Sequence, residues 1–307
     1  MTGEEPIAKS GGVRAARQVQ LLRRIHALAG VGAGIRDRIA DQGSTRTDAP
    51  LREHQQRMAA DGETAQRQAR ELGVAPRVIA MAWLAGYREI DWPTTGPSDP
   101  ARTLRWNLTN DLIGEAGQIH NMAAVAAAAR VHWLANTDNT PEPDPAASRQ
   151  LVRNMHALSI QVMTVADLLD PSERNWYSLW HQPADRRAEF INQYLGPNGR
   201  EELDWRWKGY TSAAIESDAL HAVASVRSLS DHPPSTRTMP DPNSLVLQVF
   251  LDLGPTADPA APQSPVSEAV EAVLPATAVR GWDPSPTDPG ASTDPSPSAT
   301  PDREIEP

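Results

Sequence analysis

Apolar residues recur every three or four positions along most of the chain, which is the spacing of one face of an α-helix. Residues 13–40 and 51–72 both follow an alternating four-three spacing, with a short polar break at 41–50 between them. A break this short joins antiparallel neighbours, so the pattern predicts a helical hairpin with a coiled-coil seam. We define the seam as Leu21, Ile25, Leu28, Gly32, Ile35 and Ile39 in the first segment and Leu51, Gln55, Met58, Gly62, Ala65, Ala69 and Leu72 in the second.

The seam is weak. Each of its two glycines costs about 1 kcal/mol of helix propensity relative to alanine. We therefore expect the hairpin to depend on packing against another element. The run Gly30–Gly34 superficially resembles a phosphate-binding loop, but no strand precedes it and the helical period continues through it. We interpret it as part of the first helix.

The rest of the pattern predicts a helical bundle, because long periodic segments are joined by short breaks and no strand-like alternation occurs. The fold class is therefore all-α. The predicted bundle helices span 101–135, 146–170, 171–180, 185–195 and 200–229. The expected parts of the chain are a disordered N-terminus at 1–12, the hairpin at 13–90, a linker at 91–100, the bundle at 101–230 and a tail at 231–307.

The tail is predicted to be disordered. Residues 231–307 contain 16 of the 28 prolines and carry 12 acidic but only 3 basic side chains. Such a composition buries too little apolar area to offset the loss of chain entropy on folding. Residues 244–253 form an apolar island in it, and residues 266–274 have the pattern of a short amphipathic helix. Each either packs back onto the bundle as an added strand or helix, or folds on a protein partner.

Residues 65–87 resemble the core of a helix-turn-helix, with Ala69, then Leu72-Gly73-Val74, then Ile79. In that resemblance Pro76 opens the second helix, which would enter the DNA major groove. Its expected outward side chains are those of Ala75, Pro76, Arg77, Ala80 and Met81. Only Arg77 among them is of a type that reads base edges. A helix-turn-helix used only for packing is therefore the stronger interpretation.

The run Ala69–Val74 (ARELGV), followed by Ile79 and Trp83 and preceded by a polar helix, also resembles small accessory proteins of actinobacterial plasmids and other mobile elements. That resemblance covers residues 60–220 loosely and assigns no residue a role. It implies an accessory protein of such an element and no established function.

The charge is unevenly distributed over a chain of net charge −10. Residues 1–90 carry 14 basic and 10 acidic side chains and are the only basic part. The candidate phosphate-binding residues are Arg14, Arg17, Arg23, Arg24 and Arg77, with Arg36 and Arg38 further along the first helix. Phosphate contacts carry no sequence information, so we expect nonspecific binding of duplex DNA. An ordinary solvated helix surface is the alternative.

Glu115 lies within the apolar face of the predicted helix at 101–135. A bare buried carboxylate costs several kcal/mol. Glu115 is therefore paired with Arg153, Asn154 or His156 on the facing helix, or lies at a partly wet edge of the bundle, or is an acid–base or metal-binding group with a raised pKa. The pairing is the favoured interpretation, so Glu115 is only a distant catalytic candidate. The absence of cysteine excludes thiolate chemistry, and no nucleotide-hydrolysis or serine-hydrolase motif occurs. We expect no metal and no cofactor.

Eight aromatic residues lie between 176 and 210 and predict either a cap on the bundle core or a stacking surface for a ligand. No run of about 18 apolar residues occurs, so we expect a cytoplasmic protein without a membrane span. Two functions fit these patterns. The first is a non-enzymatic DNA-associated accessory or regulatory protein. The second is a helical adaptor or scaffold that binds protein partners through the seam and through 244–253 or 266–274. A second copy of the chain is one such partner, which would make the protein a homo-oligomer.

Overall fold

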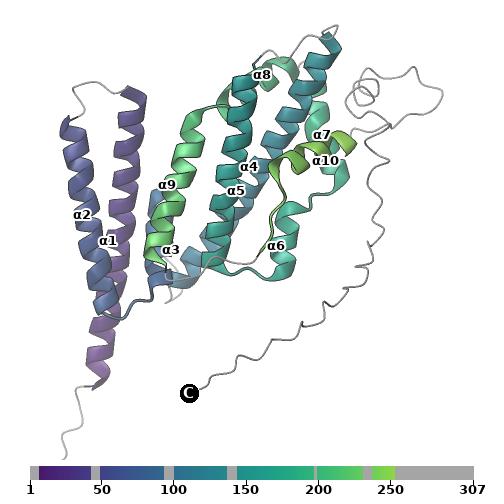
Figure 1. Ribbon diagram of the computed structural model, residues 1–307. Coiled ribbons are helices and arrows are strands. Elements are labelled where there is room, and N and C mark those ends of the chain that lie inside the picture. Colours follow the sequence, from purple (N-terminus) through teal and green to yellow (C-terminus); the bar gives the residue numbers. More distant parts are fainter. Residues whose placement is uncertain are drawn as a thin grey trace, which may run out of the picture.

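The computed structural model describes residues 7–42, 49–92, 100–136, 144–196, 199–230 and 237–252. Over these residues the protein forms ten helices and no strand, which confirms the all-α prediction. A hairpin of two long helices stands beside a helical bundle, and α3 lies between them (Figure 1). None of the helices in the described ranges is both long and apolar enough to cross a membrane.

The predicted hairpin is formed by α1 (Ile7–Gln42) and α2 (Ala49–Glu71). The seam between them is closed only in part. On α2 it buries Ala65 and Ala69, while Gln55, Met58 and Gly62 stay partly exposed. A Cβ added at Gly62 would meet nothing within 4 Å, so these positions leave space between the helices.

The start of α1 differs from the prediction. Residues 1–12 were expected to be disordered, but α1 begins at Ile7. Extending a helix that is already anchored costs far less than nucleating one, because each added residue gains a hydrogen bond. The two glycines at 11 and 12 therefore lie inside the helix rather than before it.

The segment 65–87 has the local geometry of a helix, a turn and a helix. α2 ends where Gly73 adopts a left-handed conformation with φ 82°, and the Val74 amide donates to the Ala69 carbonyl over 2.9 Å. This is the Schellman ending that glycine favours. α3 (Pro76–Tyr87) then starts with proline in its first turn. Of the linker predicted at 91–100, residues 91 and 92 follow α3 without helical structure and Pro100 begins α4. Residues 93–99 lie outside the described residues.

α3 is the element that supports the hairpin. It crosses α1 at a contact between two glycines, where a Cβ on Gly86 would lie 2.0 Å from the His26 carbonyl oxygen and a Cβ on Gly30 would lie 3.1 Å from the Gly86 oxygen. The Nε2 atom of His26 lies 2.7 Å from the carbonyl oxygen of Ile90 just beyond α3. The opposite side of α3 buries Leu84 against the bundle. The hairpin therefore packs against another element of the chain.

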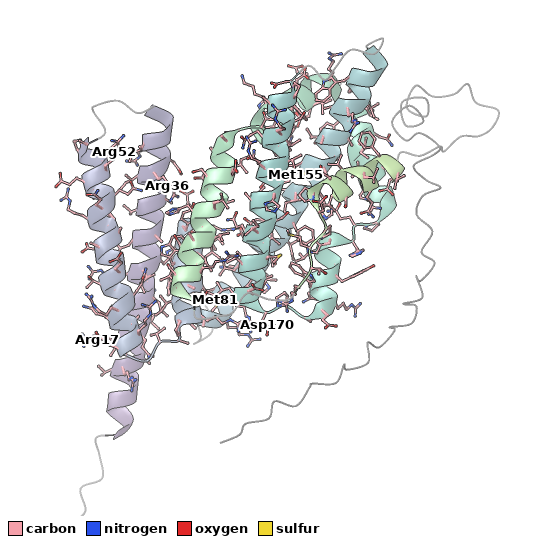
Figure 2. All side chains as sticks on the ribbon, viewed as in Figure 1. Arg17, Arg36, Arg52, Met81, Met155 and Asp170 are labelled. Atoms are coloured by element: carbon pink, nitrogen blue, oxygen red, sulfur yellow. The ribbon has the colours of Figure 1, made fainter. Side chains whose placement is uncertain are left out.

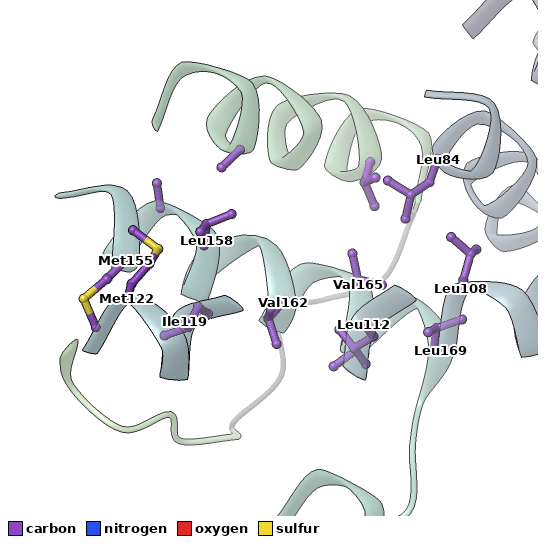
Figure 3. Packing of buried hydrophobic residues seen from close by; sticks show 14 of the residues in the cluster. Leu84, Leu108, Leu112, Ile119, Met122, Met155, Leu158, Val162, Val165 and Leu169 are labelled. Atoms are coloured by element: carbon purple, nitrogen blue, oxygen red, sulfur yellow. The ribbon is translucent and has the colours of Figure 1, made fainter. Parts of the chain in front are cut away.

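The bundle is built on α4 (Pro100–Asn136), α5 (Pro145–Leu169) and α9 (Ala213–Leu229). The apolar faces of α4 and α5 meet along their length, with α3 closing one end through Leu84 (Figure 3). Methionines from α4 and α5 pack together toward the other end (Figure 3). The labelled core residues are Leu108, Leu112, Ile119 and Met122 of α4 and Met155, Leu158, Val162, Val165 and Leu169 of α5, all of them buried.

Three short helices cover one end and one side of the bundle: α6 (Glu173–Trp180), α7 (Ala184–Leu195) and α8 (Gly199–Tyr210). The single helix predicted at 200–229 is wrong, because the chain breaks between α8 and α9. Ser212 caps the new helix by accepting from the Ala214 amide. The buried Asn154 amide donates to the carbonyl oxygens of Tyr210 (2.7 Å) and Ser212 (2.8 Å), so the break leaves neither oxygen unpaired.

The prediction of a disordered tail from residue 231 is wrong for residues 242–252. They form α10 (Pro242–Asp252), which packs against α4, α7 and α5. The apolar island within 244–253 buries Leu245, Val249 and Phe250, and Asp252 pairs with Arg187 of α7. The apolar area gained outweighs the local proline content, so the island packs back onto the bundle as a helix. Residues 253–307, including 266–274, lie outside the described residues.

Candidate functional site

Three of the arginines of α1 lie exposed along one side of the helix, whereas Arg14, Arg23 and Arg36 contact other parts of the protein. We define the outer face of α1 as Val13, Arg17, Arg24, Val31 and Arg38, all of them exposed. The last four recur every seven residues and therefore lie in one line, about 10 Å apart from one position to the next. Within the described part of the chain, none of its three arginines has a hydrogen bond or an ion pair. Figure 2 shows Arg17 and Arg36 toward opposite ends of α1.

The five candidate phosphate-binding residues divide into two groups. Arg17, Arg23 and Arg24 are exposed on α1, although the Arg23 guanidinium also lies 5.9 Å from the centre of the Trp92 ring. Arg14 instead donates two hydrogen bonds to the Leu72 carbonyl oxygen, at 3.1 and 2.8 Å. It thereby caps the C-terminus of α2, where a cation is favourable.

Arg77 is also used as a helix cap. Its Nε donates to the carbonyl oxygen of Leu168, while Arg105 donates twice to that of Leu169, at 3.2 and 2.6 Å. The three bonds satisfy carbonyl oxygens at the C-terminus of α5. Burial, followed by the nearby charge of Arg105, lowers the pKa of Arg77. Arg77 therefore lies against the bundle rather than on a free surface.

Two of the five outward positions predicted for the second helix of the helix-turn-helix are buried, while Ala75 is exposed and Pro76 and Arg77 are partly exposed. Ala80 is 0% exposed and Met81 5%, because α3 is packed between α1 and the bundle. A recognition helix must enter the major groove with one face free. The packing interpretation of residues 65–87 is therefore the one that the structure supports.

Glu115 is paired with a residue that the sequence pattern did not suggest. Its Oε1 lies 2.5 Å from the NH2 nitrogen of Arg88, and Arg88 also pairs with Asp111 one turn earlier on α4. The side chains of Arg88 and Glu115 are 9% and 12% exposed. Arg88 follows the last residue of α3, where Glu89 adopts a left-handed φ of 55° and turns the chain.

The expected partners Arg153, Asn154 and His156 are wrong. Glu115 lies on the side of α4 that contacts Arg88 at the end of α3. Arg153 pairs with Glu216 of α9, and His156 is exposed. The general expectation of a buried ion pair nevertheless holds.

Glu115 has unusual electrostatics for a paired carboxylate. Burial raises its pKa to about 7 and outweighs the attraction of Arg88. The pKa of Arg88 is raised because Glu115 and Asp111 together outweigh its own burial. Arg88 therefore stays charged, and Glu115 is the residue of this pair that exchanges a proton near neutral pH. Its Oε2 atom is buried without a hydrogen-bond partner among the described residues.

The aromatic cluster between 176 and 210 is mainly structural. Trp180 and Tyr194 are buried, and Trp207 packs edge-on against Trp133 of α4 with ring centres 5.1 Å apart. Trp205 and Tyr177 are exposed on different helices. The core interpretation therefore fits Trp180, Tyr194 and Trp207 but not the two exposed residues.

The histidines are spread over separate contacts. His120 is buried with its Nε2 3.0 Å from the Leu179 carbonyl oxygen, and His132 Nε2 lies 3.1 Å from that of Tyr194. Burial lowers the pKa of His120, so its neutral form is favoured. Across the ranges that the structure describes, no three His, Asp or Glu side chains come close enough to hold a metal ion.

Sequence reasoning missed a cavity of about 260 Å³ between α1, α2, α3 and α9. Six seam residues line it: Ile25, Leu28, Gly32, Gln55, Met58 and Gly62. Two glycines and a glutamine in an otherwise apolar seam were the available signal, since they cannot fill the space between two helices.

Searches against models of protein families, curated proteins and solved structures found no match to this chain.

Proposed function

We propose that the protein is a non-enzymatic, cytoplasmic accessory protein that associates with duplex DNA through the outer face of α1. The observation that supports this most directly is the line of Arg17, Arg24 and Arg38, which are exposed and have no partner in the described part of the chain. The resemblance to accessory proteins of mobile elements is consistent with such a role.

The geometry favours the phosphate backbone over the bases. Arg17 and Arg38 are about 31 Å apart along the helix axis, close to one turn of B-DNA. The line contains valine at its remaining position and no Asn or Gln, so it offers little that reads a base edge. The bundle and the residues that follow it are acidic, which confines the attraction to the hairpin. Binding should therefore be weak, independent of sequence and sensitive to salt.

The experiment is a mobility-shift titration of the full chain on duplex DNA at low and moderate salt. We expect dissociation constants in the micromolar range at low salt. The triple variant Arg17→Gln, Arg24→Gln and Arg38→Gln should weaken binding equally on unrelated sequences. It should also reduce the slope of log K against log salt by about 3, because three phosphate contacts are lost.

The matched control removes three exposed arginines from the bundle: Arg102→Gln, Arg174→Gln and Arg227→Gln. It changes the net charge by the same amount and should leave the salt slope unchanged. If both triple variants weaken binding equally, the outer face of α1 is not the contact. If the unmodified protein shows no salt-sensitive binding at micromolar concentration, the proposal is wrong.

A second candidate is the adaptor or scaffold, and α10 favours it. One face of α10 is buried, but Leu247 and Leu251 lie one turn apart on its other face and are 43% and 58% exposed. The seam residues, in contrast, lie between α1 and α2, and the space left among them is the cavity described above, which is too small for a protein partner. An adaptor would therefore bind through α10, with a second copy of the chain as the simplest partner.

Light scattering of the full chain tests this candidate. We expect the double variant Leu247→Ser and Leu251→Ser to shift an oligomer to monomer without loss of helix content. Ser244→Ala, on the exposed side of the same helix near its start, is the control and should leave the mass unchanged. A wild-type protein that is monomeric and captures no partner would argue against the adaptor.

A further inference from the structure

The cavity between the hairpin and the bundle, which we call the hairpin cavity, combines apolar walls with one arginine that has a nearby carboxylate but no hydrogen-bond acceptor for its buried Nε. Its volume is about 260 Å³, slightly below the usual range for drug-sized ligands, so it suits a small molecule. Ile25, Leu28, Met58 and Leu229 give it apolar walls from α1, α2 and α9. Trp83 and Tyr87 of α3, stacked with ring centres 4.9 Å apart, form an aromatic wall.

Arg36 of α1 lies at the edge of this cavity and is held in place from two sides. Its guanidinium carbon is 4.6 Å from the centre of the Tyr87 ring, and its Nε is 3.8 Å from Asp218 Oδ1 of α9. The latter distance is too long for a hydrogen bond. The Nε atom is buried without an acceptor, and Arg36 donates no hydrogen bond within the described residues.

A fixed guanidinium with free donors is a ready acceptor site for an oxyanion. Arg binds carboxylates and phosphates through paired N–H donors, and stacking on Tyr87 already fixes the plane of those donors. Asp218 beside Arg36 and Glu63 in the cavity lining are both acidic. They disfavour a doubly charged phosphate and leave a singly charged carboxylate as the better match.

We propose that the hairpin cavity binds a small organic monocarboxylate, with its carboxylate on Arg36 and its apolar body against Ile25, Met58 and Leu229. Gln55 and Gln66 of α2 also line the cavity and can form hydrogen bonds with polar atoms at the far end of the ligand. Because the ligand would touch α1, α2, α3 and α9 together, it joins the hairpin to the bundle. This role is independent of any contact between α1 and DNA.

The test compares two probes of nearly equal shape, 3-phenylpropionate and its neutral amide, by isothermal titration calorimetry on the full chain. We expect saturable binding of the acid that is at least ten-fold tighter than that of the amide. Equal affinity for the two probes would overturn the proposal. So would the absence of saturable binding of the acid up to about 10 mM, the weak limit for a specific small-molecule site.

Variants assign the preference to Arg36. Arg36→Gln should reduce the affinity for the acid to that of the amide, while Arg36→Lys should keep part of the preference because it keeps the charge but loses the paired donors. Arg57→Gln, on the exposed side of α2 and outside the cavity lining, is the control and should retain the full preference. An acid preference that survives in a folded Arg36→Gln protein, with unchanged helix content, would place the anion site elsewhere and overturn the assignment.

Discussion

The substitution Gly86→Ala should lower the free energy of unfolding by at least about 3 kcal/mol and loosen α1 from α3. The added Cβ would lie 2.0 Å from the His26 carbonyl oxygen, 2.7 Å from its carbon and 2.9 Å from its Cα. These are backbone atoms of a helix, so no side-chain rotation relieves the overlap. α1 and α3 must therefore move apart as rigid helices. This movement also lengthens the 2.7 Å contact between His26 Nε2 and the Ile90 carbonyl oxygen.

Urea unfolding followed by circular dichroism measures this effect. Gly114→Ala is the matched control, because Gly114 lies inside α4, is exposed and has no atom within 4 Å of an added Cβ. Alanine should stabilise that position by up to about 1 kcal/mol through helix propensity. We therefore expect the free energy of unfolding to fall in Gly86→Ala and to rise in Gly114→Ala. A Gly86→Ala protein as stable as wild type would mean that α1 and α3 do not cross as closely as described.

The second large effect concerns pH. Glu115 has a pKa of about 7 in the folded protein, above its ordinary value of 4.5, because it is buried. The folded state therefore binds the proton of Glu115 more tightly than the unfolded state does. The resulting stability is fully present below pH 4.5, is lost as pH rises to about 7, and changes no further above it. The difference amounts to about 3 kcal/mol.

Glu115→Gln should remove this pH dependence. Glutamine resembles the protonated carboxyl, so the variant should match wild type near pH 4.5 and exceed its stability at pH 8. Unfolding free energies of both proteins across this range give the comparison. The subtraction also removes the contribution of other groups, such as Asp218, whose pKa is raised by burial as well.

Glu189→Gln, on the exposed side of α7, controls for loss of a surface charge and should keep the wild-type pH profile. A Glu115→Gln variant that is several kcal/mol less stable than wild type at pH 8 would contradict the prediction. It would show that the attraction between Glu115 and Arg88 exceeds the cost of burying the carboxylate.

The helices of this protein could largely be predicted from the sequence, because periodic apolar spacing is a local signal. The hairpin, α4 and α5 were expected within a few residues of where they lie. Two errors came from weighing local composition against tertiary packing. The prolines around α10 led to a prediction of disorder, although Leu245, Val249 and Phe250 bury this helix against the bundle. The polar stretch around Ser212 was too short to suggest a break between α8 and α9.

The contacts between helices could not be predicted, because they depend on which faces meet. The sequence placed Glu115 in an apolar face but gave no sign that Arg88 would reach it from the end of α3. Arg14 and Arg77 looked like surface cations and proved to cap α2 and α5. Gly86 carried no signal at all, since a glycine required by a backbone crossing looks like any other glycine inside a helix.

The position of α10 affects how the protein folds during synthesis. α10 is the last helix described, yet it packs on α4, more than a hundred residues earlier in the chain. Contacts of such long sequence separation close slowly, because a long loop must be ordered first. The surface of α4 that receives Leu245 and Phe250 thus stays uncovered until α10 has left the ribosome. A growing chain therefore passes through a stage in which all the other helices can form while this apolar surface is open to chaperones.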